Sequence, residues 1–246
     1  MQSLLDTDKQ SNSTSDKNLS GSPSAFSRIS PNSVRAEPYL RLAVPFWKYG
    51  IDWLVIILTL PAWLFLMAFI TLGIKLVSRG PVLFRQKRIG YGNKPFLCLK
   101  FRSMKIGSDT LVHSQYMSDL ISRNVPMVKL DQKGDSRLIR FGSFLRATGL
   151  DELPQIINVM RGEMSFVGPR PCTLAEFAQY AEWQKERFNT LPGLTGLWQV
   201  SGKNATTFNE MVRLDIQYAR SKTVGTDLAI ILKTFPAILA QMRSSR

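Results

Sequence analysis

Two adjacent carboxylates, Asp151 and Glu152, lie at the predicted start of a helix. The helix is indicated by apolar residues at an i, i+3, i+4, i+7 spacing, namely Leu153, Ile156, Ile157 and Met160. Pro154 falls in the first turn, where a proline is tolerated. Carboxylates at this end of a helix often only cap its free N–H groups, but the same groups also attract phosphate. The pair is therefore either a cap or part of a site that handles anions.

Arginines flank this pair in the sequence on both sides. Arg146 precedes it, and Arg170 follows in a Gly-Pro-Arg-Pro segment that two prolines stiffen. An aspartate can attack phosphorus, and a neighbouring carboxylate can hold the divalent cation that offsets a diphosphate. Arginine matches phosphate geometry with two hydrogen bonds. Together these residue types predict phosphoryl transfer on an anionic substrate.

The charge of the chain points to partners that carry phosphate. The 246 residues include 32 Lys and Arg against 18 Asp and Glu, which gives a net charge of +14. Nucleic acid, anionic lipid and nucleotide are the partner classes that such an excess favours. The length allows one domain with appended segments and excludes a large multidomain machine. Two cysteines are too few for a disulfide framework and suit a reducing compartment.

The composition divides the chain into three parts. Residues 1–37 contain ten serines and a single aromatic side chain, so they cannot bury enough apolar surface to offset the entropy of ordering. We expect a disordered Ser-rich tail over residues 1–45, a membrane segment over 46–78 and a catalytic domain on the cytoplasmic side over 79–246.

Residues 53–74 form an uncharged apolar stretch of 22 residues, long enough to cross a bilayer as a helix of about 33 Å. Pro61 lies near its midpoint and favours a kink or a break. Basic residues flank the stretch on both sides, and the positive-inside tendency then places both ends on the cytoplasmic face. We therefore favour a re-entrant helix-break-helix over a spanning helix, with a buried core helix as the third alternative.

The remaining pattern predicts a mainly α fold with a small β-hairpin. The hairpin falls within residues 82–101, around a turn at 90–95. An amphipathic helix is predicted over 174–188, and Gly193 and Gly196 are expected to mark a turn. A last apolar helix over 228–242 contains Pro236 and lies either in the membrane interface or against the core.

Five blocks of sequence, in this order, resemble the bacterial sugar transferase family, the small monotopic phosphoglycosyl transferases that start exopolysaccharide assembly. The blocks are residues 100–104, 135–146, 150–155, 161–171 and 192–204. The resemblance covers about residues 46–240 and includes the two carboxylates. It also implies a re-entrant membrane helix, in agreement with the flanking charges.

The resemblance implies a reaction and a role for each matching residue. A hexose 1-phosphate, glucose or galactose by preference, is transferred from a UDP-sugar to undecaprenyl phosphate at the cytoplasmic face of the bacterial inner membrane, and UMP is released. Asp151 matches the nucleophile that forms a covalent aspartyl intermediate. Glu152 matches the partner carboxylate, and the pair is associated with Mg²⁺. The matching phosphate-binding positions are Lys100, Arg102, Arg146 and Arg170.

Two other classes of protein remain as alternatives. A membrane-tethered nucleic-acid-binding protein would account for the basic charge, but the sequence has no recognisable DNA- or RNA-binding pattern and the carboxylate pair would stay unexplained. An inactive scaffold of the same fold would be expected to lack the pair. We expect an anionic bilayer as a partner and no nucleic acid, and a homo-oligomer is possible.

Overall fold

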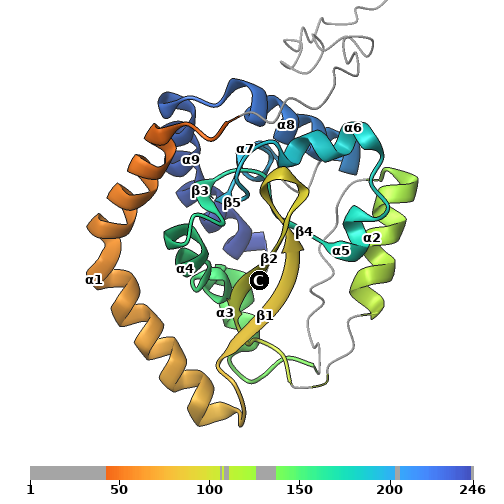
Figure 1. The fold of residues 1–246 in the computed structure, drawn as a ribbon. Helices are drawn as coiled ribbons and strands as arrows, with labels where there is room; N and C mark the ends of the chain where they lie inside the picture. Colours follow the sequence, from red (N-terminus) through yellow and green to blue (C-terminus); the bar gives the residue numbers. More distant parts are fainter. Residues whose placement is uncertain (1–42, 106, 108–110, 126–136, 203–205, 245–246) are drawn as a thin grey trace, which may run out of the picture. The chain divides into compact units, whose positions relative to one another are not determined.

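In a computed structural model, the backbone is described for residues 43–105, 107, 111–125, 137–202 and 206–244, and the side chains of 111–114 and 241–244 are excluded. Most of the predicted tail lies outside these residues. Every element below lies within the unit Pro38–Arg246. The α-helices are α1 Phe46–Val77, α2 Leu111–Arg123, α3 Gly142–Thr148, α4 Gln155–Met160, α5 Leu174–Phe177, α6 Glu182–Lys185, α7 Leu197–Val200, α8 Phe208–Ser221 and α9 Val224–Ser244 (Figure 1). The 3-10 turns are η2 Tyr91–Asn93, η3 Leu150–Glu152 and η4 Glu186–Phe188.

The predicted hairpin is present and is longer than its apolar residues suggested. Strands β1 (Leu83–Ile89) and β2 (Pro95–Phe101) pair in antiparallel register from Leu83 opposite Phe101 to Ile89 opposite Pro95. A short strand β4 (Cys172–Thr173) joins the other edge of β1 and makes a three-stranded sheet. The addition matters because β4 immediately follows the segment that carries Arg170.

A second sheet of two strands lies beside that segment. Strands β3 (Ser165–Val167) and β5 (Gly193–Thr195) run parallel. A Cβ at Gly168 would lie 2.2 Å from the Leu191 carbonyl oxygen, and one at Gly193 would lie 2.1 Å from the Gly168 nitrogen. Gly193 and Gly196 were expected to mark a turn. The structure shows instead that they let two backbone segments touch.

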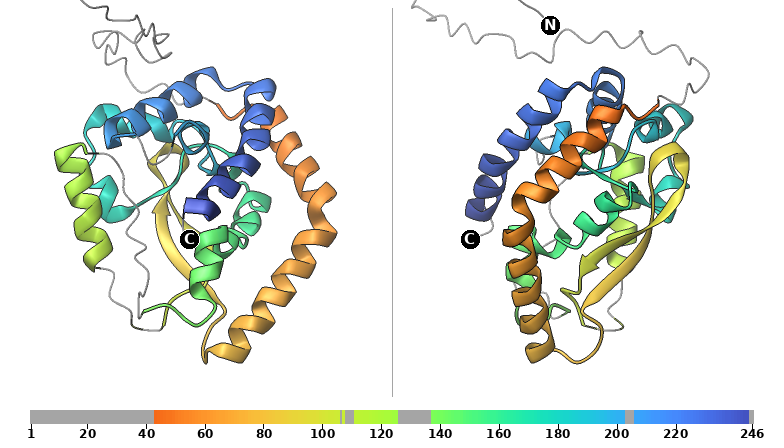
Figure 2. Two further views of the ribbon diagram at one scale, coloured as in Figure 1. Left: turned by 180° about the vertical axis from the view of Figure 1, so that it is seen from behind. Right: turned by 60° about the vertical axis from the view of Figure 1, so that its left-hand side comes forward.

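Helix α1 differs from the predicted helix-break-helix, because it is assigned as one continuous helix through Pro61. It changes direction about halfway along (Figures 1 and 2), and Pro61 is the sixteenth of its 32 residues. Before the proline Thr59 Oγ1 donates to the Val55 carbonyl (2.7 Å), and after it Trp63 Nε1 reaches back to the Ile56 carbonyl (3.4 Å). A proline removes one backbone hydrogen bond, and the helix responds with a bend instead of an interruption.

Most of α1 is apolar and exposed. By length and composition it is the one helix among the described residues that could cross a membrane. Its outward side chains include Leu58, Phe65 and Phe69. Its inward side chains pack on the domain at two places: Ile56 lies with Val159 and Met164, whereas Ile70 and Ile74 lie with Phe101 and Leu145.

A buried ion pair fixes the start of α1. Lys48 Nζ donates to Asp227 Oδ2 (2.7 Å), to Tyr218 Oη (2.8 Å) and to the Val167 carbonyl (2.7 Å). These partners come from α9, α8 and β3, and the views in Figure 2 show the first turns of α9 beside the start of α1. One turn later, Asp52 Oδ1 accepts hydrogen bonds from Ser165 Oγ and the Phe166 N–H, both at 2.9 Å.

Two helix predictions need revision. The amphipathic helix expected over 174–188 is three short pieces, α5, α6 and η4, because Thr173 caps α5 while Gln184 accepts from the Ala181 N–H and starts a new helix there. The apolar side chains of this stretch still share one core, in which Tyr180 and Phe188 pack with Phe208. Helix α9 extends beyond the predicted 228–242 and is not interrupted at Pro236.

Candidate active site

A left-handed glycine places the two carboxylates. Gly149 (φ +73°) ends α3, and its N–H bonds to the Arg146 carbonyl. The chain then forms η3, which contains Asp151 and Glu152, before α4 begins at Gln155. The helix was predicted to begin near Asp151. It begins later because Pro154 has no N–H to donate, and the turn before it closes with i→i+3 bonds such as Glu152 N–H to the Gly149 carbonyl (3.1 Å).

Glu152 is the centre of a cluster of charges. Its Oε1 accepts from Lys100 Nζ and from Arg170 Nη2, both at 2.7 Å, and its Oε2 accepts from Arg170 Nη1 at 3.2 Å. Lys100 comes from β2, and Arg170 comes from the segment between β3 and β4. The structure therefore brings together three of the residues that the sequence singled out, from three separate elements.

Asn158 of α4 sets the distance between β2 and the carboxylates. Its Nδ2 donates to the Leu97 carbonyl (2.7 Å), and its Oδ1 accepts from the Leu99 N–H (3.0 Å). The side chain is fully buried. Its position on the inner face of α4, beside Ile156 and Val159, predicts burial, but nothing in the sequence indicates that its partner is the hairpin.

Asp151 has a different environment from its neighbour. Its carboxylate accepts no hydrogen bond from the residues that the structure describes. Burial, the largest effect, raises the pKa of Asp151 to about 6; Lys100 opposes this change and Glu152 adds to it. At neutral pH the carboxylate is thus mostly ionised and is not tied to a partner among these residues, as a nucleophile must be.

Glu152 is strongly anionic by comparison. Burial would raise its pKa, but Arg170 and Lys100 outweigh burial and hold the pKa of Glu152 well below its ordinary value. Burial lowers the pKa of Lys100, and Glu152 acts against this. Adjacent acids with opposite pKa shifts are typical of a catalytic pair whose members have different roles.

The two other predicted phosphate ligands come from α3 and from the residue that follows β2. Arg146 is in the last turn of α3, and its charge lowers the pKa of Asp151. Arg102 lies at the end of α1, where its Nη1 donates to the Arg79 carbonyl (2.7 Å) and its Nη2 to the Ser78 carbonyl (3.0 Å). Arg102 thus holds a helix terminus in this structure, and phosphate binding by Arg102 and Arg146 stays a prediction.

Arg88 lies beside Lys100 and Arg170, although its place in the sequence indicated only a charge that flanks the apolar stretch. Its Nη1 donates to the Pro171 carbonyl (2.5 Å), and it lies around one narrow gap with Cys98, Lys100, Gln155 and Arg170. The hairpin register contains a signal that could have found it. Arg88 lies opposite Phe96 and Lys100 opposite Phe84, so both basic side chains project from the same face of the hairpin.

The sequence over residues 44–241 matches the family described as bacterial sugar transferase. The chain belongs to the bacterial sugar transferase family.

Several curated members of the bacterial sugar transferase family are similar to the chain. Galactosyl transferase CpsE of Streptococcus agalactiae is 43% identical over 166 residues, which are 65% of this chain and 35% of that protein. A UDP-glucose:undecaprenyl-phosphate glucose-1-phosphate transferase of Caulobacter vibrioides is 38% identical over 210 residues, 82% of this chain and 73% of that protein.

Exopolysaccharide production protein ExoY of Sinorhizobium fredii is 36% identical over 191 residues, 78% of this chain and 84% of that protein. The chain spans about a third of the length of several curated relatives that it matches, CpsE among them. It spans most of ExoY.

The carboxylates offer a limited donor set for a metal ion. No group of three or more His, Cys, Asp or Glu side chains gathers among the described residues. Mg²⁺ commonly uses one or two protein carboxylates together with substrate phosphates. Asp151 has oxygens available, whereas both oxygens of Glu152 face Lys100 and Arg170. Of the two carboxylates, only Asp151 offers oxygens in this arrangement, and Mg²⁺ binding by the pair stays a prediction.

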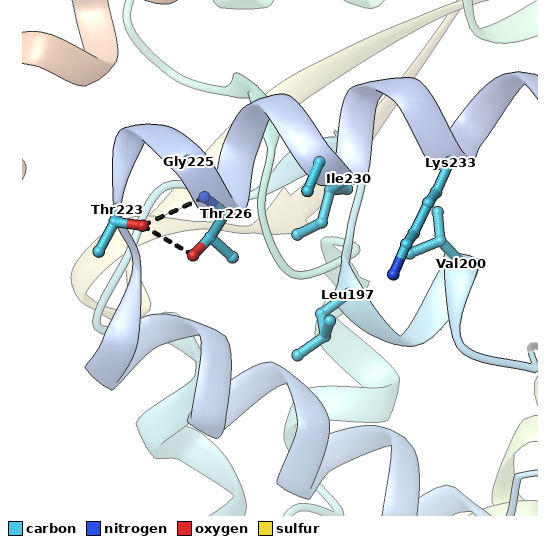
Figure 3. A pocket seen from close by; sticks show the side chains of 8 residues that line it. Leu197, Val200, Thr223, Gly225, Thr226, Ile230 and Lys233 are labelled. Atoms are coloured by element: carbon cyan, nitrogen blue, oxygen red, sulfur yellow. Dashed lines mark hydrogen bonds between the residues drawn. The ribbon is translucent and has the colours of Figure 1, made fainter.

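The larger pocket is elsewhere in this sugar transferase. It has a volume of about 480 Å³ and lies between α7 and the first half of α9. Figure 3 shows Lys233 beside Val200 at one end and the hydrogen-bonded Thr223 and Thr226 at the other. None of its lining residues belongs to the Glu152 cluster.

Proposed function

We propose that the chain transfers a hexose 1-phosphate from a UDP-sugar to undecaprenyl phosphate and releases UMP. One observation carries the proposal: the Asp151 carboxylate is mostly ionised at neutral pH and accepts no hydrogen bond from the described residues, beside a carboxylate that holds two cations. The names of relatives support it, since one is called an undecaprenyl-phosphate galactose phosphotransferase and another a UDP-glucose:undecaprenyl-phosphate glucose-1-phosphate transferase.

The first step is an attack by Asp151 on phosphorus. A carboxylate oxygen forms a bond to the sugar-proximal phosphorus of the UDP-sugar, and the bond from that phosphorus to the bridging oxygen breaks. UMP leaves with the bonding electrons. The enzyme then carries the hexose phosphate on Asp151. In the second step an oxygen of undecaprenyl phosphate attacks the same phosphorus and releases the Asp151 carboxylate.

Lys100 and Arg170 bind and orient the phosphates. Both are held by Glu152, so they lie next to the nucleophile. Arginine pairs with phosphate as it pairs with carboxylate, and Arg170 can therefore exchange Glu152 for a phosphate with little change of geometry. Mg²⁺ would be held by Asp151 and Glu152 and would offset the charge of the diphosphate.

The same proposal places the chain on the inner membrane, with the domain at the cytoplasmic face. The exposed apolar side chains of α1 support it. On α9 the exposed residues Leu228, Leu232, Phe235 and Leu239 form one stripe, as expected for a helix in the membrane interface. The bend of α1 is compatible with both ends on one side. A phosphate acceptor at the headgroup level requires a site at that level.

The direct test is UMP release in lipid nanodiscs containing undecaprenyl phosphate and Mg²⁺, with UDP-glucose and UDP-galactose as separate donors. We expect wild-type turnover that requires acceptor and metal, and no turnover for Asp151→Asn. Asp119→Asn is the matched control, because Asp119 is an exposed carboxylate on α2. Full activity of Asp151→Asn would refute the assignment of the nucleophile.

Trapping of the intermediate tests the covalent step. With a donor labelled in the sugar and no acceptor, wild-type protein should retain label after denaturation at low pH, and Asp151→Asn should not. The sugar follows from the preferred donor. Turnover of neither donor would move the test to N-acetylated and deoxy UDP-sugars. Steeply salt-dependent DNA binding without turnover of any donor would favour the nucleic-acid alternative.

A further inference from the structure

A buried arginine outside the carboxylate cluster contacts the backbone of Arg170. Arg187 lies in η4 and its side chain is 2% exposed. Its Nη1 donates to Tyr180 Oη (3.1 Å), and its Nη2 forms an ion pair with Asp215 Oδ2 of α8 (2.5 Å). The same Nη2 donates to the Arg170 carbonyl at 3.1 Å. One guanidinium thus joins α8 to the segment that presents Arg170.

The neighbouring carbonyl accepts a hydrogen bond from a second guanidinium. Arg88 Nη1 donates to the carbonyl of Pro171, and Arg88 belongs to β1. Two buried guanidiniums therefore hold consecutive carbonyls of one short segment. Proline supplies no backbone N–H of its own, so the segment from Gly168 to Pro171 depends more on the bonds that its carbonyls accept.

Stability alone does not account for the Arg187–Asp215 pair. Removing two charges from water costs several kcal/mol per ion, and apolar side chains of similar volume often give an equally stable protein. The distinctive property of the pair is the direction in which Arg187 donates. A planar guanidinium has its donors in a fixed fork, so Arg187 can pair with Asp215 by charge while it donates to Tyr180 and to a carbonyl, which an apolar side chain cannot do.

We propose that Arg187, held by Asp215, is a positioning residue of the transferase: it fixes the Arg170 carbonyl and thereby the direction from which the Arg170 guanidinium reaches Glu152 and the substrate phosphates. This inference rests on the proposed function, because its main readout is turnover. Arg187 does not touch the carboxylates in this arrangement and acts through Arg170.

The test replaces the ion pair by apolar side chains of similar volume, as Arg187→Met with Asp215→Leu in one chain. We expect a cooperative thermal transition close to the wild-type one, since no unpaired charge is left. The value of kcat/KM should fall about tenfold to a hundredfold, because small displacements of a phosphate-orienting group have effects of this size. A folded double variant with activity within twofold of wild type would overturn the proposal.

A double-mutant cycle shows whether the effect passes through Arg170. The same apolar replacement is made in an Arg170→Gln background, where Arg170 can no longer orient a phosphate. We expect the replacement to reduce kcat/KM less than threefold there, because residues that act through one another are not additive. An equal fold-loss in both backgrounds would show that Arg187 acts independently of Arg170, and the proposal would be wrong.

The control removes an exposed ion pair between the same two elements. Arg220 of α8 pairs with Glu186 of η4, and the Arg220 side chain is 49% exposed. Arg220→Gln should leave kcat/KM unchanged. If the double variant gives no cooperative transition, Arg187→Lys replaces it, since Lys keeps the charge but loses the fork, and the same fold-loss and the same cycle apply.

The failure of this inference can be distinguished from failure of the proposed function. Binding of UMP to the wild-type protein is measured by calorimetry alongside turnover. Absence of both for every UDP-sugar would refute the proposed function. An active wild type with an equally active, folded apolar double variant would refute only the role of Arg187.

Discussion

The guanidinium of Arg170 meets the carboxylate of Glu152 with both terminal nitrogens, Nη2 at 2.7 Å from Oε1 and Nη1 at 3.2 Å from Oε2. A phosphate presents a pair of oxygens in a similar way. Glu152 thus takes the position of an anion between Lys100 and Arg170 and compensates two cations that would otherwise repel each other.

Glu152→Gln should separate substrate binding from turnover. The amide keeps the shape but not the charge, so Lys100 and Arg170 lose the anion that competes with the donor. We expect UMP to bind more tightly, while kcat falls about a hundredfold, the usual scale for removing one charge-stabilising group. Calorimetry and the UMP-release assay measure the two effects. Unchanged affinity together with unchanged kcat would contradict this role.

The pH dependence of the reaction should report Asp151. Its carboxylate must be ionised to attack, and its raised pKa of about 6 means that activity is lost as the pH falls through that value. An ordinary aspartate would lose activity only near about pH 4. We expect kcat/KM to be level above pH 7 and to fall about tenfold per unit well below pH 6.

The variant Lys100→Met tests whether the acid limb reports the pKa of Asp151. Lys100 lowers the pKa of Asp151, so Lys100→Met should move the acid limb of kcat/KM to higher pH in addition to weakening the donor. Asp119→Asn should leave the limb in place. An acid limb that stays near pH 6 in Lys100→Met would show that another group titrates.

The buried pair at the start of α1 should be important for stability. Asp227→Ala leaves Lys48 buried without its counter-ion, and removal of one partner of such a pair costs about 3–5 kcal/mol. Thermal unfolding of the domain in detergent measures the loss. Asp119→Ala removes a carboxylate from an exposed pair with Arg123 and should cost less than about 0.5 kcal/mol. Similar losses for the two variants would contradict the predicted difference.

The topology of α1 can be decided by labelling. Phe46→Cys and Val77→Cys place thiols at its two ends, and the native Cys98 and Cys172 are buried. With a re-entrant helix, an impermeant maleimide should label both new thiols only after cells are permeabilised. Labelling of one of them in intact cells would establish a spanning helix.

Pro61→Leu restores a backbone N–H and tests whether the proline is the cause of the bend.

The residues that gather around Glu152 were predictable from the sequence, and the long-range contacts that support them were not. Asp151, Glu152 and Arg170 follow from residue type and local context, and the resemblance added Lys100. The hairpin follows from two apolar runs around a turn. Arg187 and Asp215 had no such signal, because their partners are distant in the chain and a buried ion pair leaves no periodic pattern.

The incorrect predictions have local causes. Apolar spacing over 174–188 was read as one helix, but the caps at Thr173 and Gln184 divided it into pieces while its side chains kept a common core. For Arg102, which follows the same strand as Lys100, phosphate binding stays a prediction, and its guanidinium donates to the carbonyls of Ser78 and Arg79.

Helix α1 is joined to the domain at both ends, through Lys48 at its start and through Arg102 and Ile74 at its close. A domain attached to both ends of its membrane helix cannot rotate relative to that helix as a domain attached at one end can. If α1 lies in the bilayer as proposed, the fold fixes the height of Asp151 relative to the headgroups. An acceptor confined to that plane then arrives by lateral diffusion alone, and turnover should follow its surface density per lipid, not its amount per volume of suspension.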